Sequence, residues 1–367
     1  MVIVRYFTIA SALLVSCFSF PTDLNIRRIL DKLYSFPDTP EILSEDPNWP
    51  DNNVDIGQIG GLAIALNNDL VVFHRGSRKW GFGSFNSDNT YAQKDQGPIA
   101  AETIVHFDVK NGKKINGEGA NKYYMPHGLT IDGAGNKWVT DVALHQVFRI
   151  PSDQSEPDLE LGTAFVPGKT NNTFCKPTDV AVASNGDFFV ADGYCNGRVM
   201  KFSKDGSLIT EWGHKSNNGG PVTEYTLNVP HSLALVEELD LLCVADRENS
   251  RILCYRAGIN DPSKAGDFHG TLVKFDQIGR VFAIEYSPVN QVMYAVVSPE
   301  ENELGARGFT IEMDGRIVDS WGVVNMGSHS QPHDVTVSKN GNDVFVGDIG
   351  DVRPVTRFRK KKQIYVG

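Results

Sequence analysis

Three histidines occupy equivalent positions in copies of one short motif, a proline followed by the histidine and then by an alternating apolar segment. They are His127, His231 and His333. Neutral imidazole nitrogens are common zinc ligands, and a site with three of them leaves a fourth position open for a reacting molecule. Imidazole also binds copper, iron and nickel. A single histidine here would more simply cap the turn at its proline by a hydrogen bond. Three equivalent histidines favour a shared metal ion, and we predict zinc.

Asp334 directly follows His333, where the other two copies have Gly128 and Ser232. A carboxylate next to a ring of metal ligands can hold a hard cation such as calcium, with carbonyl oxygens completing the shell. The alternative is that Asp334 only orients a histidine or caps a turn. The residues alone leave both interpretations open.

Two arginines and a tyrosine lie in loops that should share a face with the histidines. Arg75, Tyr194 and Arg247 each follow the second strand of a copy, and antiparallel neighbours return that strand to the end where the first one began. A guanidinium matches a carboxylate, which predicts a small carboxylate-bearing ligand. A tyrosine near two arginines and a dication ionises more easily and can act as a base. Alternatively, the arginines form ion pairs that tie blades together.

The elements that must position these side chains are repeated at intervals of about 50 residues. Thr178 occupies the histidine position in one further copy, and the segments 59–65 and 280–285 provide degenerate copies. Each copy contains a strand, a turn rich in Gly, Asn or Asp, and two more β-rich strands. Six copies without helical periodicity predict an all-β fold, a six-bladed β-propeller. The three histidines then belong to alternate blades and face one point on the axis.

The segments outside the repeats and the net charge indicate where the protein resides and which partners it excludes. We expect a signal peptide at 1–20, an N-terminal extension at 21–54, the propeller at 55–358 and a C-terminal tail at 359–367. The net charge of −10 argues against a nucleic-acid partner. We see no later apolar run long enough to span a membrane and expect a secreted or granule-lumen monomer. Asn171 begins a sequon that can carry a glycan in that compartment.

The cysteines agree with export. Of the five, Cys17 lies in the predicted signal peptide, and the remaining four suggest two disulfides. Cys243 and Cys254 are cross-strand neighbours if their hairpin turns midway between them. Cys175 precedes a first strand, and Cys195 lies in the loop after the second strand of the same copy. We therefore expect Cys175–Cys195 and Cys243–Cys254, which would stiffen two of the site loops.

Together, the motifs resemble the peptidyl-α-hydroxyglycine α-amidating lyase family, the second catalytic module of peptidylglycine α-amidating monooxygenase. Each motif alone indicates only a propeller with NHL-like repeats, but the combination is specific and runs from about residue 55 to 357. The motifs that carry the resemblance are Phe73-His74-Arg75-Gly76, Met125-Pro126-His127-Gly128-Leu129, Ala191-Asp192-Gly193-Tyr194-Cys195-Asn196, Pro230-His231-Ser232-Leu233-Ala234 and Val244-Ala245-Asp246-Arg247-Glu248-Asn249.

The resemblance implies a reaction and a role for each residue. The family cleaves the N–Cα bond of a peptidyl-α-hydroxyglycine to an α-amidated peptide and glyoxylate, the second step of peptide amidation. The four cysteines match its two disulfides. The implied roles are zinc ligation by His127, His231 and His333; calcium ligation by Asp334 and the backbone carbonyls of Leu62 and Leu129; and catalysis by Tyr194, Arg75 and Arg247.

The chain shows no copper monooxygenase module before the repeats, so we expect a free-standing lyase supplied by a separate copper monooxygenase. Two other functional hypotheses compete with the lyase. A calcium-dependent propeller lactonase or esterase would need a cluster of carboxylates and Asn in the channel, and three histidines do not match it. A non-catalytic NHL-type binding module would need no ring of metal ligands.

Overall fold

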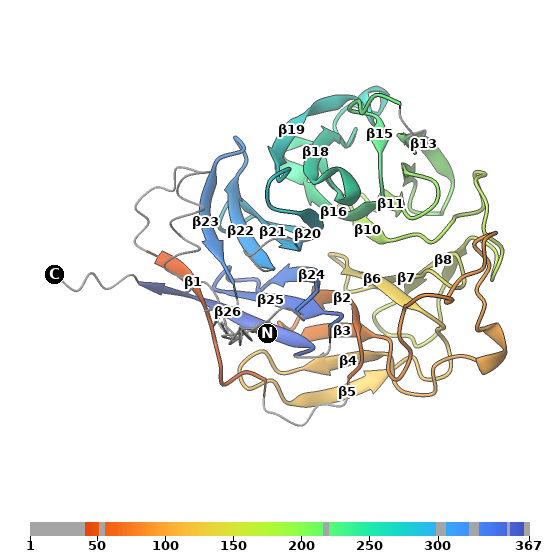
Figure 1. Cartoon of the computed structure of the whole chain (residues 1–367), viewed down its shortest axis with the longest axis horizontal. Helices are drawn as coiled ribbons and strands as arrows, with labels where there is room; N and C mark the ends of the chain where they lie inside the picture. The colour runs from red at the N-terminus through yellow and green to blue at the C-terminus, as the bar shows by residue number, and fades with distance from the viewer. Residues whose placement is uncertain are drawn as a thin grey trace, which may run out of the picture.

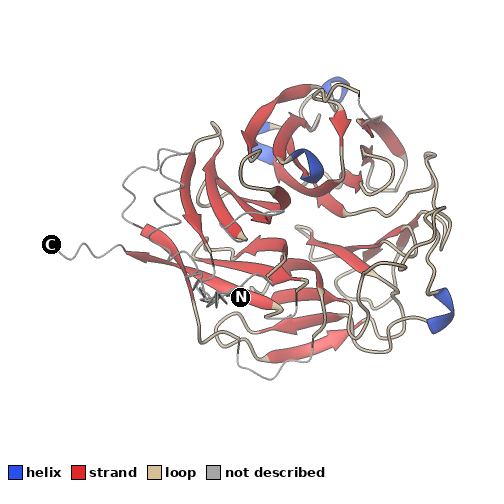
Figure 2. Ribbon diagram, in the orientation of Figure 1, coloured by secondary structure: helices blue, strands red, loops and turns tan. Residues whose placement is uncertain are grey.

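The computed structural model describes residues 41–50, 56–215, 220–298, 306–322, 330–350 and 353–362. Those residues form six four-stranded antiparallel sheets and one two-stranded parallel ladder. The sheets stand around a central channel like the blades of a propeller (Figure 1), and helical structure is confined to short turns (Figure 2). The predicted six-bladed all-β propeller is confirmed. The predicted signal peptide and most of the predicted extension lie outside the described residues.

Within each blade, the strands follow one another from the channel to the rim, with the first strand innermost. The first three blades are β2 (Ile59–Ile64), β3 (Leu70–His74), β4 (Ile104–Phe107) and β5 (Lys114–Glu118); β6 (Pro126–Ile131), β7 (Lys137–Asp141), β8 (Gln146–Ile150) and β9 (Leu159–Leu161); and β10 (Asp179–Val182), β11 (Phe188–Asp192), β12 (Arg198–Phe202) and β13 (Leu208–Trp212). Because its four strands are consecutive in the chain, each of these blades is a local meander.

The last three blades repeat this order, and the sixth takes its outer strand from the other end of the chain. They are β16 (Pro230–Val236), β17 (Leu241–Asp246), β18 (Arg251–Arg256) and β19 (Phe268–Lys274); β20 (Arg280–Ser287), β21 (Val292–Ser298), β22 (Arg307–Glu312) and β23 (Ile317–Trp321); and β24 (Pro332–Val337), β25 (Asp343–Asp348), β26 (Val355–Lys362) and β1 (Glu41–Glu45). The small ladder and the 3-10 turns are β14 (His214–Lys215), β15 (Thr226–Leu227), η1 (Lys94–Gln96), η2 (Glu237–Leu239), η3 (Arg247–Asn249) and η4 (Pro262–Lys264).

Strand β1 closes the ring, which differs from the predicted domain boundaries. Residues 41–45 were expected in the N-terminal extension, yet they pair antiparallel with β26, which itself runs past the predicted end of the propeller at 358. Arg357 Nη2 lies 2.6 Å from Asp46 Oδ2, and Arg353 Nη1 lies 2.7 Å from Glu45 Oε1. These ion pairs join the two ends of the propeller. One short strand far from its partner has no sequence signal of its own, since neither a turn nor a repeat marks it.

The core lies between neighbouring blades, where their faces meet. One apolar cluster joins residues of the fourth and fifth blades, among them Cys243, Cys254, Val281 and Phe309. The second strands are buried most completely, and every residue of β17 is buried. Burial of apolar area on both faces of each sheet stabilises the ring. It also fixes the register of the inner strands, since a slip of one residue would turn the apolar set away.

The histidine position of the repeat coincides with an irregularity in strand pairing. The pairing shifts between Pro230 and Ser232, and between Pro332 and Asp334, so His231 and His333 are the extra residues of two β-bulges. The pairing of β6 shifts where His127 lies, and β2 and β20 shift at the matching positions. A bulge bends the strand and re-aims a side chain. The repeat therefore places one residue per bulge at the mouth of the channel.

Candidate functional site

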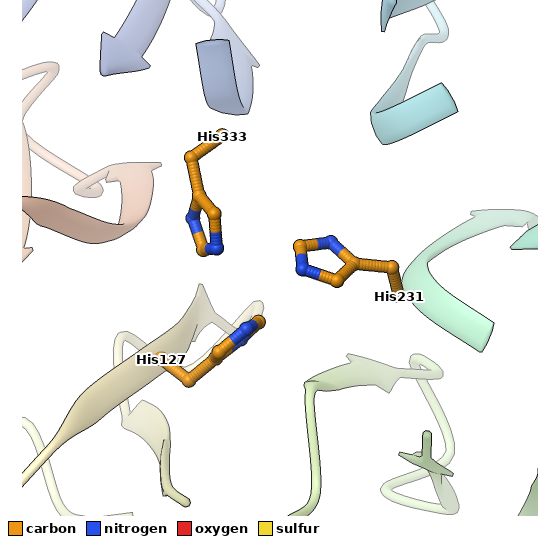
Figure 3. A group of neighbouring side chains, drawn as sticks. All are labelled: His127, His231 and His333. Carbon is orange, nitrogen blue, oxygen red and sulfur yellow. The ribbon is translucent and has the colours of Figure 1, made fainter. Parts of the chain in front are cut away.

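The imidazoles of His127, His231 and His333 converge on one point in the channel (Figure 3). Their ring centroids are 4.7 Å, 4.7 Å and 4.8 Å apart, and their candidate ligand atoms all lie within 4.8 Å of one another. They come from β6, β16 and β24, the inner strands of alternate blades, and none is more than 3% exposed. The predicted convergence is what the structure shows.

The outward nitrogen of each ring is held by the next blade. Every Nδ1 lies within hydrogen-bonding distance of a backbone carbonyl at the matching repeat position of that blade. The pairs are His127 with Thr178 at 2.8 Å, His231 with Phe282 at 2.7 Å, and His333 with Gly60 at 3.1 Å. A carbonyl only accepts, so each Nδ1 carries the hydrogen and the Nε2 lone pair points to the axis. Such outer partners orient metal-ligating histidines.

The three rings are also held neutral. Burial lowers the pKa of His127, His231 and His333 well below the usual histidine range, and the positive charges of Arg75 or Arg247 lower it further. The neutral imidazole is the form that binds metal. Three lone pairs of one tautomer around one point fit a divalent metal ion. The cluster can therefore hold a metal, as predicted.

The hydroxyl of Tyr194 lies against two of the three histidines. Its Oη is 2.9 Å from His127 Nε2 and 3.0 Å from His231 Nε2, and Arg247 Nη1 approaches it at 3.4 Å. Burial raises the pKa of Tyr194, whereas Arg247 and Arg75 lower it in part. As expected, the charges of the two arginines favour ionisation of this phenol. Burial has the larger effect, so the net pKa is raised.

Arg75 is a buried cation without a carboxylate partner among the described residues. Its side chain is 1% exposed, and burial lowers its pKa to about 10, so it remains charged at neutral pH. Nε donates to the Pro126 carbonyl at 3.0 Å and Nη1 to Gln58 Oε1 at 3.1 Å, but Nη2 has no hydrogen-bond partner. A buried, unsatisfied donor is costly. The arrangement suits an anion. Arg75 joins the first and second blades through the Pro126 carbonyl, but it does not form the interblade ion pair of the alternative hypothesis.

Arg247 has a different environment. Its Nη2 lies 2.6 Å from Glu248 Oε1, and Arg280 Nε lies 2.9 Å from the second oxygen of the same carboxylate. The guanidinium carbon also lies 5.2 Å from the centre of the Tyr194 ring and 4.9 Å from that of Phe282. Arg247 thus forms an ion pair and also lies beside the phenol. The charge of Arg75 also acts on the phenol, but Arg75 forms no ion pair with a described residue.

Both predicted disulfides are present. Cys175 is bonded to Cys195, the residue after Tyr194. Cys243 and Cys254 face each other in the β17–β18 register and are bonded. The first bond ties the loop of Tyr194 to the segment before β10, and the second clamps the hairpin whose loop carries Arg247. Paired cysteines fit a secretory protein. Asn171, the predicted glycan acceptor, is exposed.

A set of buried aspartates positions the site loops. These residues were not among those predicted from the sequence to take part in the site. They end the second strands of four blades and are at most 2% exposed: Asp141, Asp192, Asp246 and Asp348. Asp192 accepts hydrogen bonds from the Cys175 backbone amide at 2.7 Å, from Asn196 Nδ2 at 2.7 Å and from Arg198 Nε at 3.0 Å. The signal was available, because an aspartate recurs at one position of the repeat.

Three buried carboxylates on inner strands, Asp179, Glu285 and Asp334, interact electrostatically. Asp334 Oδ2 accepts from the Leu62 backbone amide at 2.6 Å, and burial with the nearby charges of Asp179 and Glu285 raises the pKa of Asp334 well above its usual range. Burial raises the pKa of Asp179 to about 7 and that of Glu285 to about 8. No ion pair joins these three to a cation within the described ranges. A cavity of about 290 Å³ lies beside Glu285, Leu62 and Leu129. A buried carboxylate such as that of Asp334 is a donor that hard cations prefer.

The fold and the site define a β-propeller whose channel holds a cluster of three histidines that could bind a metal ion. Residues 174–202 and 227–255 match the NHL repeat. The chain is 40% identical over 314 residues to peptidyl-alpha-hydroxyglycine alpha-amidating lyase 2 of Drosophila melanogaster, which covers 85% of this chain and 74% of that protein. It is 42% identical to peptidyl-glycine alpha-amidating monooxygenase B of Xenopus laevis over 83% of this chain, but spans only 34% of that longer protein.

The chain belongs to the peptidyl-alpha-hydroxyglycine alpha-amidating lyase family, which confirms the resemblance drawn from the sequence. Solved structures agree on the fold alone. A gluconolactonase-type structure superposes with a TM-score of 0.56 at 10% identity, covering 91% of this chain and 96% of that one. In the part of the chain that the structure describes, no helix is long and apolar enough to cross a membrane.

Proposed function

We propose that this protein cleaves the N–Cα bond of peptidyl-α-hydroxyglycines to give a peptide amide and glyoxylate. One observation carries the proposal: the Tyr194 hydroxyl contacts two of the three convergent histidines, with the unpaired guanidinium of Arg75 nearby. This combines a metal position, a proton acceptor and an anion site. The relatives named as lyases of this substrate support the assignment.

Two metal ions are part of the proposal. His127, His231 and His333 would hold zinc, whose chemistry is to polarise a hydroxyl oxygen and lower its pKa. Asp334 with the carbonyls of Leu62 and Leu129 would hold calcium, a structural ion that offsets the repulsion among the channel carboxylates. The single hydrogen-bonded tautomer of each histidine supports the first site, and the clustered, unpaired acids support the second.

The chain's own residues then divide the reaction. Arg75 binds the carboxylate that becomes part of glyoxylate, because its free Nη2 and its charge are otherwise unmatched. Tyr194 removes the proton of the α-hydroxyl. The hydroxyl oxygen forms the aldehyde carbonyl as the N–Cα bond breaks, and the amide nitrogen takes up a proton, which Tyr194 returns. Arg247 and Arg75 both favour the phenolate, so the proton transfer depends on them.

The substrate is a hydroxylated peptide, which a separate copper monooxygenase would supply. Relatives that carry both activities in one longer chain support this order of reactions. The two disulfides support maturation in the secretory pathway, where we place the protein, secreted or retained in granules.

The direct test is an assay of glyoxylate release from a synthetic N-acyl-phenylalanyl-α-hydroxyglycine by the purified protein, with zinc and calcium supplied. We expect release far above the spontaneous rate. Tyr194→Phe should bind the same amount of metal and lose at least about 100-fold in kcat, which is the usual range for one proton-transfer group. Release no faster than the uncatalysed reaction would refute the function. A near-normal rate in Tyr194→Phe would refute only the role of the phenol.

A further inference from the structure

Trp80 is a half-buried aromatic residue that contacts three of the candidate site groups. It lies in the long loop between β3 and β4. Its ring centre is 4.7 Å from that of Tyr194 and 6.2 Å from that of His127, and the Arg75 guanidinium carbon lies 5.4 Å from the indole. The indole therefore borders the space in which the hydroxyglycine unit would react.

The backbone of Trp80 is fixed to the same network. Its amide donates to Gln58 Oε1 at 3.1 Å, the oxygen that also accepts from Arg75 Nη1. The position of the indole is thus set together with that of the guanidinium. An acceptor that is shared by two site residues holds both in position before the substrate binds.

The indole also packs against other aromatic rings of the same loop. Phe85 packs on Trp80 with centroids 5.2 Å apart, and Tyr91 packs on Phe85 at 5.6 Å. Tyr91 in turn accepts a hydrogen bond from Arg78 Nη1 at 2.8 Å. Trp80 nevertheless keeps part of its surface exposed. A braced indole with an open face beside a reaction site is a ready surface for an apolar group.

We propose that Trp80 is a specificity-determining residue, whose exposed indole surface binds the side chain that precedes the hydroxyglycine in the peptide. This rests on the proposed function. If Arg75 holds the carboxylate and the histidines face the hydroxyl, both ends of the hydroxyglycine are occupied, and the peptide leaves the site through its amide nitrogen. The preceding residue then passes the loop that carries Trp80. Large apolar and aromatic side chains are the class this surface recognises.

The test compares two substrates, N-acyl-phenylalanyl- and N-acyl-glycyl-α-hydroxyglycine, in four proteins: the wild type, Trp80→Ala, Trp80→Phe and Phe82→Ala. The readout is the ratio of kcat/KM for the phenylalanyl substrate to that for the glycyl substrate. We expect the wild type to prefer the phenylalanyl substrate and Trp80→Ala to lower the ratio about tenfold, the size of one apolar side-chain contact. Trp80→Phe should lie between them.

Phe82 is the matched control, since it lies two residues away on the same loop and is fully exposed. Phe82→Ala should keep the wild-type ratio. The proposal is overturned if the wild-type ratio is near one or if Trp80→Ala leaves the ratio unchanged. A residue that only supports Tyr194 would give the second result, because its loss slows both substrates equally. If Trp80→Ala does not fold, the ratio in Trp80→Phe decides. No glyoxylate from either substrate in the wild type would instead refute the proposed function.

Discussion

At the scale of single residues, the candidate site is a set of groups whose states are fixed by their neighbours. Burial keeps each histidine neutral, and a carbonyl of the next blade fixes its tautomer by accepting from Nδ1. Arg75 keeps its charge inside the protein without a counter-ion among the described residues. Such a cation is costly unless a ligand pairs with it. The unmatched charge of Arg75 therefore supports the proposal that an anion binds beside the three histidines.

Replacing Arg75 tests this directly. Arg75→Met should lower kcat/KM about 100-fold or more, since the carboxylate loses a buried, charged partner. The free energy of unfolding should change by no more than about 1 kcal/mol, because a buried charge without a partner contributes little to stability. Glyoxylate release and denaturant unfolding measure the two effects.

The matched variant is Arg198→Met, another buried arginine, whose Nε is paired with Asp192 Oδ2 at 3.0 Å. It should lose about 3 kcal/mol of stability because it leaves that carboxylate unpaired. If Arg75→Met unfolds as readily as Arg198→Met and keeps its activity, Arg75 is a structural tie.

Residue types and repeat spacing were enough to predict which side chains meet. His127 and His333 are far apart in sequence, but a shared repeat position places them together. The unpaired Nη2 of Arg75 and the net direction of the Tyr194 pKa were beyond sequence reasoning. Both depend on burial by loops from other blades, and no local pattern encodes that.

At the scale of elements, the site depends on how each hairpin ends. Second strands end in buried aspartates, and Asp192 accepts hydrogen bonds from the Cys175 amide before the blade and from the Asn196 and Arg198 side chains after it. The loop that follows Asp192 carries Tyr194, and the Cys175–Cys195 bond closes it. The blades were predictable because apolar and polar residues alternate along each strand and turn residues recur in each copy of the repeat. The aspartates were read only as strand ends, since their partners lie in loops that no period describes.

Asp192→Ala should therefore destabilise the loop that presents Tyr194. We expect the free energy of unfolding to fall by about 3 kcal/mol, since Arg198 Nε, Asn196 Nδ2 and the Cys175 amide all lose their buried acceptor. Asp153→Ala, at an exposed position, should change it by less than about 0.5 kcal/mol. Denaturant unfolding of both variants is the measurement. Equal stability of the two would contradict the role of the strand-end aspartates.

At the scale of the whole molecule, the ring is closed by its two ends. Strand β1 brings Leu43, only 8% exposed, into the apolar cluster that joins the fifth and sixth blades. The sixth blade also supplies His333 from β24. Closure of the ring and completion of the metal centre are therefore linked. The sequence did not predict this strand, because its pairing spans nearly the entire chain.

Leu43→Asp should open this closure. Burying a carboxylate among apolar side chains should cost about 3 kcal/mol or more of stability. Zinc affinity should fall with it, because His333 loses its support. Leu239→Asp, at a leucine that is 44% exposed, is the control and should leave both unchanged. Thermal unfolding and zinc titration would show the difference, and an intact zinc affinity in a destabilised Leu43→Asp would separate closure from the site.

The central claim is that one metal ion on His127, His231 and His333 supports the lyase reaction. The most direct measurement is the rate of glyoxylate release as chelator-treated protein is titrated with zinc at saturating calcium. We predict a rate that rises linearly and stops at one equivalent of zinc per chain, and no comparable rise in His231→Ala. Full activity before zinc is added, or the same titration curve in His231→Ala, would contradict the account.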